Sequence, residues 1–166
     1  MVATRLPDDD PARTRSRLAA RTGTRRPARP PDAIAAAIAA ITGLLEGGRT
    51  DLSSIACDPG EIDPFFARVY EAARAIPAGE TTTYGAIART LGDKHLAQAV
   101  GRALRRNPLP IIVPCHRVLG AGGRLTGFSA AGGVETKRRM LRAEGVWVAG
   151  SGDLFDALPL MERPPR

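Results

Sequence analysis

The stretch Asn107-Pro108-Leu109-Pro110-Ile111-Ile112-Val113-Pro114-Cys115-His116-Arg117-Val118 is the most informative part of this chain. A cysteine is nucleophilic only as a thiolate, and a nearby histidine or positive charge lowers its pKa. Cys115 is followed directly by an imidazole and a guanidinium. The apolar run 111–113 predicts a buried strand, and Pro114 would end its pairing, so that a turn presents the thiol. On this pattern alone a reactive cysteine is one possibility, and a small buried hydrophobe is the more common role of a lone cysteine.

The overall composition restricts the class of protein. The chain has 166 residues, 43% of them hydrophobic, which predicts one domain or one domain plus a fragment. No apolar run reaches the length of a membrane span and no secretion signal is recognisable, so we expect a soluble, cytoplasmic protein. Two cysteines and two histidines show no metal-ligand spacing and no disulfide framework, so we expect no metal and no disulfide.

The net charge is +7, carried almost entirely by arginine. Because phosphate contacts dominate affinity for nucleic acids, this excess favours a polyanionic partner such as DNA. Arginines that merely solvate ordinary helix surfaces are the alternative explanation of the charge.

The N-terminal third predicts two helices. Asp10 before Pro11 is typical of a helix start, and Gly23 of a stop, which places a basic helix at 10–22. A Pro/Arg linker follows at 25–31. Asp32 then caps a helix that runs to about Glu46, and a weak strand is expected at 52–56.

The second half predicts a pair of short helices joined by a tight turn. Asp63-Pro64 begins an amphipathic helix. Thr82 or Thr83 caps the next helix, and a further helix runs from Lys94 to about Arg106. This arrangement fits a helix-turn-helix, or else an ordinary helical hairpin. A short strand or hairpin around 111–126 and a helix at 134–143 complete the chain.

Four segments together resemble the O6-alkylguanine-DNA alkyltransferases, also called methylated-DNA–protein-cysteine methyltransferases. They are the opening stretch, Thr83-Tyr84-Gly85-Ala86-Ile87-Ala88, Gly127-Phe128-Ser129 and Arg142-Ala143-Glu144-Gly145. The resemblance covers about residues 62–147. It implies an α+β, mostly helical fold, in which a winged-helix-like helix-turn-helix domain occupies 61–150. A truncated remnant of a ribonuclease-H-like N-terminal domain would occupy 1–60, and a C-terminal tail 151–166.

The resemblance also implies a reaction. The protein would repair duplex DNA by transferring an alkyl group from O6-alkylguanine, and as a further candidate from O4-alkylthymine, irreversibly to its own Cys115. His116 would take the thiol proton through water, and Glu144 would orient His116. Asn107 would brace the turn that carries the cysteine. A thioether sulfur is a very poor leaving group, so each molecule would act once. The resemblance implies no cofactor, because the lesion itself is the alkyl donor.

By the same resemblance, the second helix of the pair enters the minor groove and the target base is flipped out of the stack. Gln98 stands where the family usually has an arginine, and Phe128 where many relatives have a tyrosine that can donate a hydrogen bond. A monomer is expected. The residues that the resemblance assigns to DNA or lesion binding are Tyr84, Ala97, Gln98, Ala99, Gly101, Arg102, Leu125, Phe128 and Ser129.

Two other functions are compatible with parts of this pattern. One is a non-catalytic lesion-binding sensor of the alkyltransferase-like type, which Cys115 argues against but Gln98 and Phe128 keep open. The other is a thiol hydrolase that uses Cys115 and His116, which the helix-turn-helix argues against.

Overall fold

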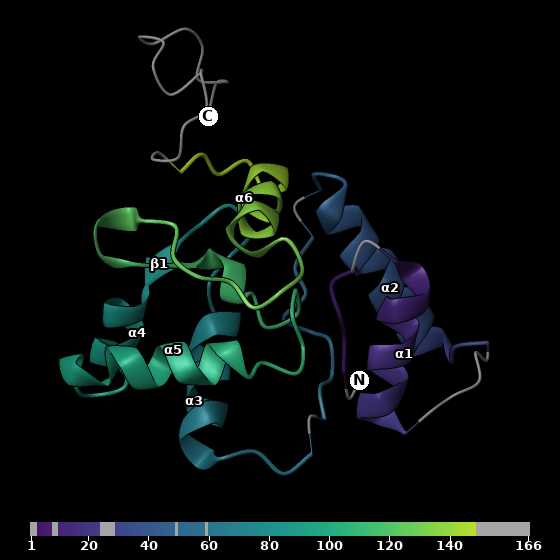
Figure 1. The fold of residues 1–166 in the computed structure, drawn as a ribbon, viewed down its shortest axis with the longest axis horizontal. Coiled ribbons are helices and arrows are strands. Elements are labelled where there is room, and N and C mark those ends of the chain that lie inside the picture. The colour runs from purple at the N-terminus through teal and green to yellow at the C-terminus, as the bar shows by residue number, and fades with distance from the viewer. Residues whose placement is uncertain (1–2, 8–9, 24–28, 49, 59, 149–166) are drawn as a thin grey trace, which may run out of the picture.

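The computed structural model describes residues 3–7, 10–23, 29–48, 50–58 and 60–148. Helices α1 (Pro11–Thr22) and α2 (Asp32–Leu45) both lie at one end of the molecule (Figure 1). Helices α3 (Pro64–Arg74), α4 (Tyr84–Thr90) and α5 (Ala97–Arg105) form the other part, and α6 (Gly133–Ala143) lies across from α5. The described chain is therefore mostly helical, as predicted.

The ends of α1 follow from local sequence. The Asp10 carboxylate accepts a hydrogen bond from Ala12 N at 2.8 Å, and Pro11 occupies the first turn. Gly23 ends the helix with φ +70°, a conformation that glycine adopts without steric penalty. The predicted basic helix is confirmed. In α2, by contrast, Asp32 is the first helical residue and makes no cap, because Pro31 occupies the cap position.

The helix pair is present, with one correction. The Thr83 hydroxyl accepts from Ala86 N at 3.1 Å and starts α4. The second helix does not run unbroken from Lys94. Asp93 caps a short 3-10 turn, η1 (Lys94–Leu96), which Leu96 N closes on Asp93 O, and α5 begins only at Ala97. The 3-10 turn changes the chain direction before the helix.

Helices α3, α4 and α5 share one hydrophobic core. Val69, Ile87 and Val100 contribute one fully or almost fully buried side chain from each helix. Burying a side chain of this size contributes about 1.5–3 kcal/mol. Leu109, Ile112, Val113 and Val118 extend the core toward the segment that carries Cys115.

The apolar run 111–113 is buried, but the predicted strand there is wrong. Pro110 and Val113 form only an isolated bridge, and Ile111 has φ +80°, a rare conformation for a β-branched residue. Prolines on both sides of the run remove backbone donors, so regular pairing cannot extend. The strand expected at 52–56 is likewise a turn, closed by Ile55 N on Leu52 O.

The small sheet forms between distant segments. Strand β1 (Thr82–Thr83) pairs in parallel with β2 (Val118–Leu119), with Thr82 opposite Val118. A strand within 111–126 was predicted, but its partner is β1 and not a neighbouring hairpin strand. Next come η3 (Ala121–Gly123) and a loop leading to α6, which begins one residue before the prediction. The sheet thereby joins the start of α4 to the end of the Cys115 segment.

Candidate active site

Cys115 lies in a 3-10 turn, η2 (Cys115–Arg117), at the wall of a cavity of about 400 Å³. The cavity lies between α4, α5 and the loop before α6. Cys115 is 8% exposed, so its thiol meets solvent only through the opening of this cavity. The lining residues are Tyr84, Gly101, Leu104, Arg105, Cys115, Thr126, Gly127, Phe128 and Ser129.

Opposing effects set the acidity of the thiol. Burial raises the pKa of Cys115, whereas the Asn107 amide and the positive charge of Lys137 lower the pKa. The net direction is upward, since a thiolate is poorly solvated in this site. The thiol form therefore predominates at neutral pH in the free protein, and a base is needed to remove its proton.

Behind Cys115, His116 and Arg117 share one buried carboxylate. His116 Nε2 lies 2.8 Å from Glu144 Oε1, and Arg117 donates to both oxygens of Glu144 at 2.8 and 2.9 Å. A third Arg117 donor reaches Ile76 O. Burial alone raises the pKa of Glu144, but the hydrogen bonds and charges of His116 and Arg117 prevail and lower the pKa to about 2. The carboxylate is thus ionised.

This geometry defines the state of the histidine. An ionised carboxylate can only accept, so His116 carries its hydrogen on Nε2. Burial lowers the pKa of His116, although Glu144 opposes that effect, and the imidazole is neutral. Its Nδ1 lone pair has no hydrogen-bond partner among the described residues. His116 is therefore arranged to accept a proton at Nδ1 while Glu144 holds the ring.

Asn107 braces the loop that leads to the cysteine. Its Nδ2 donates to Val113 O at 2.8 Å, and its Oδ1 accepts from Leu109 N at 2.8 Å. Both bonds close the loop around Ile111, whose positive φ stores strain in the backbone. The role predicted for Asn107, bracing through backbone contacts, agrees with this geometry.

Lys137 is a residue of the site that the sequence analysis missed. Its side chain is fully buried, and Nζ donates to Val118 O at 2.6 Å. Burial lowers the pKa of Lys137 to about 8, and Nζ lies 5.8 Å from the centre of the Tyr84 ring. A sequence signal was available. Lys137, Met140, Leu141 and Glu144 recur at i, i+3, i+4 and i+7, the spacing of one buried helix face.

The predicted lesion-site residues are brought together in part. Tyr84, Gly101, Phe128 and Ser129 line the cavity, but Leu125 does not, because Thr126 and Gly127 occupy that side. A Cβ at position 101 would lie 3.9 Å from the Tyr84 ring, an ordinary contact distance, so α5 runs beside that ring with room for a methyl group.

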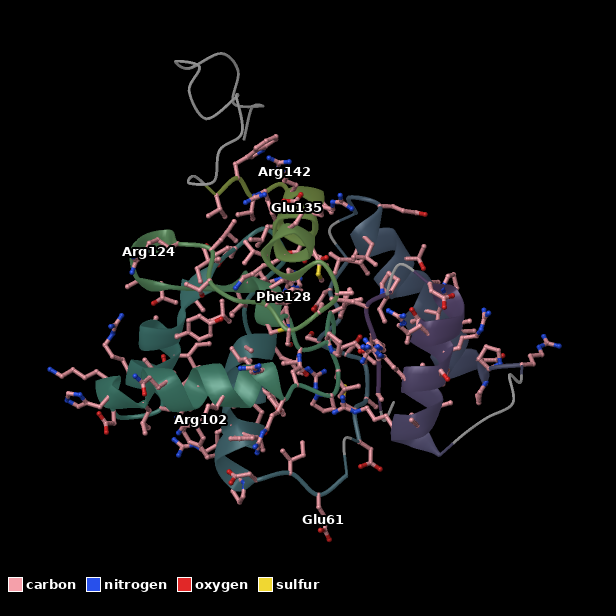
Figure 2. All side chains as sticks on the ribbon, in the orientation of Figure 1. Glu61, Arg102, Arg124, Phe128, Glu135 and Arg142 are labelled. Atoms are coloured by element: carbon pink, nitrogen blue, oxygen red, sulfur yellow. The ribbon has the colours of Figure 1, made fainter. Side chains whose placement is uncertain are left out.

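Two of the predicted DNA-contacting residues, Gln98 and Arg102, are exposed one helical turn apart and form the outer side of α5. Ala97 and Ala99 are half-buried, and Ala97 packs against the core. In Figure 2, Arg102 lies on α5, and Phe128 lies between α5 and α6. Helix α5 thus exposes the polar side chains of Gln98 and Arg102 on its outer side, whereas the small residue Gly101 lines the cavity.

Comparison with known proteins agrees with this geometry. Residues 64–146 match the sequence profile of the DNA-binding domain of 6-O-methylguanine DNA methyltransferase. The chain belongs to this family. A methylated-DNA–protein-cysteine methyltransferase of Methanosarcina acetivorans is 51% identical over 81 residues, which is 49% of this chain and 51% of that protein.

Two solved structures of family members resemble the fold. Mycobacterium tuberculosis OGT in complex with DNA has a TM-score of 0.59 and 41% identity, over 65% of this chain and 63% of that one. O6-methylguanine-DNA methyltransferase from Pyrococcus kodakaraensis has a TM-score of 0.63 and 31% identity, over 82% of both chains. This methyltransferase-family chain spans about half the length of the sequence relatives that it matches.

Two further properties concern the described residues alone. They contain no group of three or more histidine, cysteine, aspartate or glutamate side chains that could hold a metal ion. Within the same residues, no helix has the length and apolar character needed to cross a bilayer. The predicted tail at 151–166 lies outside the described part of the chain.

Proposed function

We propose that this protein repairs DNA by transferring an alkyl group from O6-alkylguanine to Cys115 in a single, irreversible turnover. The observation that carries the proposal is the position of Cys115 at the wall of the cavity, directly before the buried His116–Glu144 pair. The names of its family relatives support the same chemistry. O4-alkylthymine presents a similar alkylated oxygen and is a second substrate of the same reaction.

The residues of the site account for each part of the reaction. His116 Nδ1 takes the thiol proton through a water molecule, while Glu144 stabilises the imidazolium that forms. The sulfur then attacks the alkyl carbon. The S–C bond forms as the C–O6 bond breaks, and the guanine leaves with the electron pair and gains a proton. Lys137 stabilises the transient thiolate by its charge. The resulting thioether cannot be displaced, which ends the activity of that molecule.

The substrate enters as a base rotated out of duplex DNA. We infer that α5 lies in the minor groove, because Ala97, Ala99 and Gly101 allow a close approach of the helix backbone. The cavity behind α5 has the size class of small-molecule sites and would hold the flipped base. The similarity to an OGT solved in complex with DNA supports DNA as the partner.

Two side chains of this chain depart from the usual family pattern. Gln98 can hydrogen-bond to the cytosine left unpaired but lacks the charge of arginine. Phe128 packs against the base without donating a hydrogen bond. We infer slower base flipping or an altered lesion preference as the consequence. The sensor alternative is not favoured, because the nucleophile is present.

We further infer that the protein acts as a monomer in the cytoplasm, associated with DNA. Residues 1–60 would correspond to a shortened ribonuclease-H-like domain, 61–150 to the winged-helix-like alkyltransferase domain, and 151–166 to a tail. The helical content of the described part of 1–60 is compatible with this division.

The proposal is tested by incubating the protein with duplex DNA that contains O6-methylguanine. Intact mass and peptide mapping should show one added methyl group on Cys115, lost in Cys115→Ser. Cys57→Ser is the matched control, since Cys57 bonds to Ile55 O away from the cavity, and it should react like the wild type. Tight binding of the lesion without methylation would identify a sensor instead. A folded protein that neither binds nor reacts would refute both functions.

A further inference from the structure

Helix α1 is strongly basic and contributes little to the core. Its twelve residues include Arg13, Arg15, Arg17 and Arg21, and no acidic residue. All four arginines are exposed, and none of the described residues of the helix is buried. The reaction proposed above uses no part of this helix. Its charge therefore calls for a separate explanation.

The arginines are ordered along the helix. Arg13, Arg17 and Arg21 are spaced four residues apart and so follow one side, here called the α1 arginine stripe. The half-buried residues Thr14 and Leu18 follow the adjacent side and face the rest of the protein. At 1.5 Å per residue, the stripe extends over about 12 Å. A packed side next to a charged side fixes the direction in which the arginines are presented.

The stripe lies close to the basic end of α5. The Tyr70 hydroxyl donates to Ala103 O at 3.0 Å, which places Tyr70 beside the C-terminal half of α5. Burial raises the pKa of Tyr70 to about 12, while the positive charges of Arg21 and Arg106 both act to lower the pKa. Arg21, in the last turn of α1, and Arg106, the residue that follows α5, thus act on the same tyrosine. Figure 1 shows the C-terminal end of α5 directed toward α1.

Basic residues also gather at the C-terminal end of α5. Arg102, Arg105 and Arg106 are exposed at the end of α5. The N-terminal segment between the two parts is held in place by Thr4, whose N and Oγ1 donate to Pro108 O and Pro110 O. The α1 arginine stripe is thus positioned on the same body as the outer side of α5.

We propose that the α1 arginine stripe binds the phosphate backbone of the DNA duplex whose lesion is presented at α5, beside the groove contact. The proposal rests on the proposed function, because it takes α5 to be the lesion-binding helix. Phosphates rise by 3.4 Å along each strand, so about 12 Å spans three or four of them. Guanidinium groups match phosphate oxygens with paired hydrogen bonds. The contact would be independent of sequence and of the lesion.

The test is the salt dependence of binding to an undamaged duplex of about two helical turns. Each phosphate contact adds about 0.9 to the slope of log affinity against log salt. Arg13→Gln/Arg21→Gln should therefore lower the slope by about 1.8 and weaken binding about 30-fold near 0.15 M salt. Arg13→Lys/Arg21→Lys retains both charges and should restore most of the slope.

Matched controls separate this contact from general charge and from the reaction. Arg139→Gln/Arg142→Gln removes two exposed arginines from α6, which lies across the molecule from α5, and should change the slope little. Alkyl transfer from free O6-benzylguanine requires no phosphate contact and should be unchanged in Arg13→Gln/Arg21→Gln. If the wild type does not accept the benzyl group from free O6-benzylguanine, the proposed function is refuted, whereas the measurement of salt dependence remains valid.

Three outcomes would overturn the α1 proposal. One is a slope for Arg13→Gln/Arg21→Gln equal to that of the wild type. Another is an equal loss in the α6 control, which would indicate a diffuse charge effect. The third is failure of the lysine variant to restore binding although its helix content, measured by circular dichroism, matches the wild type.

Discussion

Replacing Glu144 by glutamine perturbs the buried network behind the candidate nucleophile without changing its shape. In the protein, one carboxylate accepts three hydrogen bonds from His116 and Arg117. Glutamine supplies one oxygen and one amide group. Its amide would face a donor, and the Arg117 guanidinium would keep its charge with no buried counter-charge.

The magnitude follows from the pKa of the carboxyl group. The pKa of Glu144 falls from 4.5 to about 2, and its side chain and that of His116 are 2% and 0% exposed, so water screens their interaction weakly. At about 1.4 kcal/mol per pKa unit, ionisation of Glu144 stabilises the fold by about 3 kcal/mol. Removing one partner of a buried pair typically destabilises a protein by about 3–5 kcal/mol. We expect Glu144→Gln to lower the free energy of unfolding by about 3 kcal/mol.

The dependence on pH has a definite sign. A carboxyl group with a depressed pKa stabilises the fold above its unfolded value and loses that contribution as pH falls from 4.5 toward about 2. Burial lowers the pKa of His116, so the unfolded chain binds its proton first, and stability also falls as pH drops below 6.5. Both groups destabilise the folded state on acidification. Glu144→Gln should abolish the part of this acid-induced loss of stability that arises from protonation of the Glu144 carboxylate.

Urea unfolding followed by circular dichroism, from about pH 7 down to about pH 3, measures both quantities. Glu135→Gln is the matched control, because Glu135 is 47% exposed and pairs with Arg138 and Arg139 at the surface. We expect it to change stability by less than about 1 kcal/mol. A loss in Glu144→Gln no larger than that of the control would refute the reasoning. Parallel curves of unfolding free energy against pH for the wild type and Glu144→Gln would also refute the reasoning.

Four further changes test other parts of the site. Asn107→Ala removes the bonds to Leu109 N and Val113 O and should lower stability by about 2 kcal/mol in urea; an unchanged midpoint would contradict this. Lys137→Met should raise the pKa of Cys115, shifting the pH–rate profile with iodoacetamide upward, whereas Lys94→Met at an exposed position should not. Gly101→Ala meets the Tyr84 ring at an ordinary contact distance, so it should stabilise α5 by about 0.5–1 kcal/mol yet weaken DNA binding; stronger DNA binding would argue against a groove-facing α5. Gln98→Arg should speed transfer from duplex O6-methylguanine and leave transfer from the free base unchanged; equal duplex rates would show that Gln98 does not limit base flipping.

Local signals in the sequence predicted most helices correctly. Asp10 with Pro11, Asp63 with Pro64 and Thr83 each cap a helix where expected, because a cap depends on residues two or three positions away. The strand predicted at 111–113 is absent, although the residues that prevent it lie near in sequence. The run 111–113 has strand-forming residues, yet Asn107 and the flanking prolines hold it as a loop.

In the candidate site, too, some features are visible in the sequence and others only in the folded structure. The order of Cys115, His116 and Arg117 is visible in the chain, and the resemblance to a family assigned Glu144 to His116. The structural part played by Arg117, which bonds to Glu144 and Ile76 O, is visible only in the folded protein. Lys137 was missed, because a lysine in an amphipathic helix ordinarily faces water. The resemblance to the family assigned Leu125 to DNA or lesion binding, whereas Thr126 and Gly127 line the cavity and Leu125 does not.

The sequence by itself determined most helix boundaries, the basic character of α1 and the presence of a cysteine beside a histidine, since these depend on near neighbours and composition. Only the tertiary structure decided that Glu144 ionises against His116 and Arg117, that Lys137 is buried, and that β1 pairs with β2. These features join residues more than 15 positions apart. Their energies arise from removing charges and backbone groups from water, which happens only when the whole chain has packed.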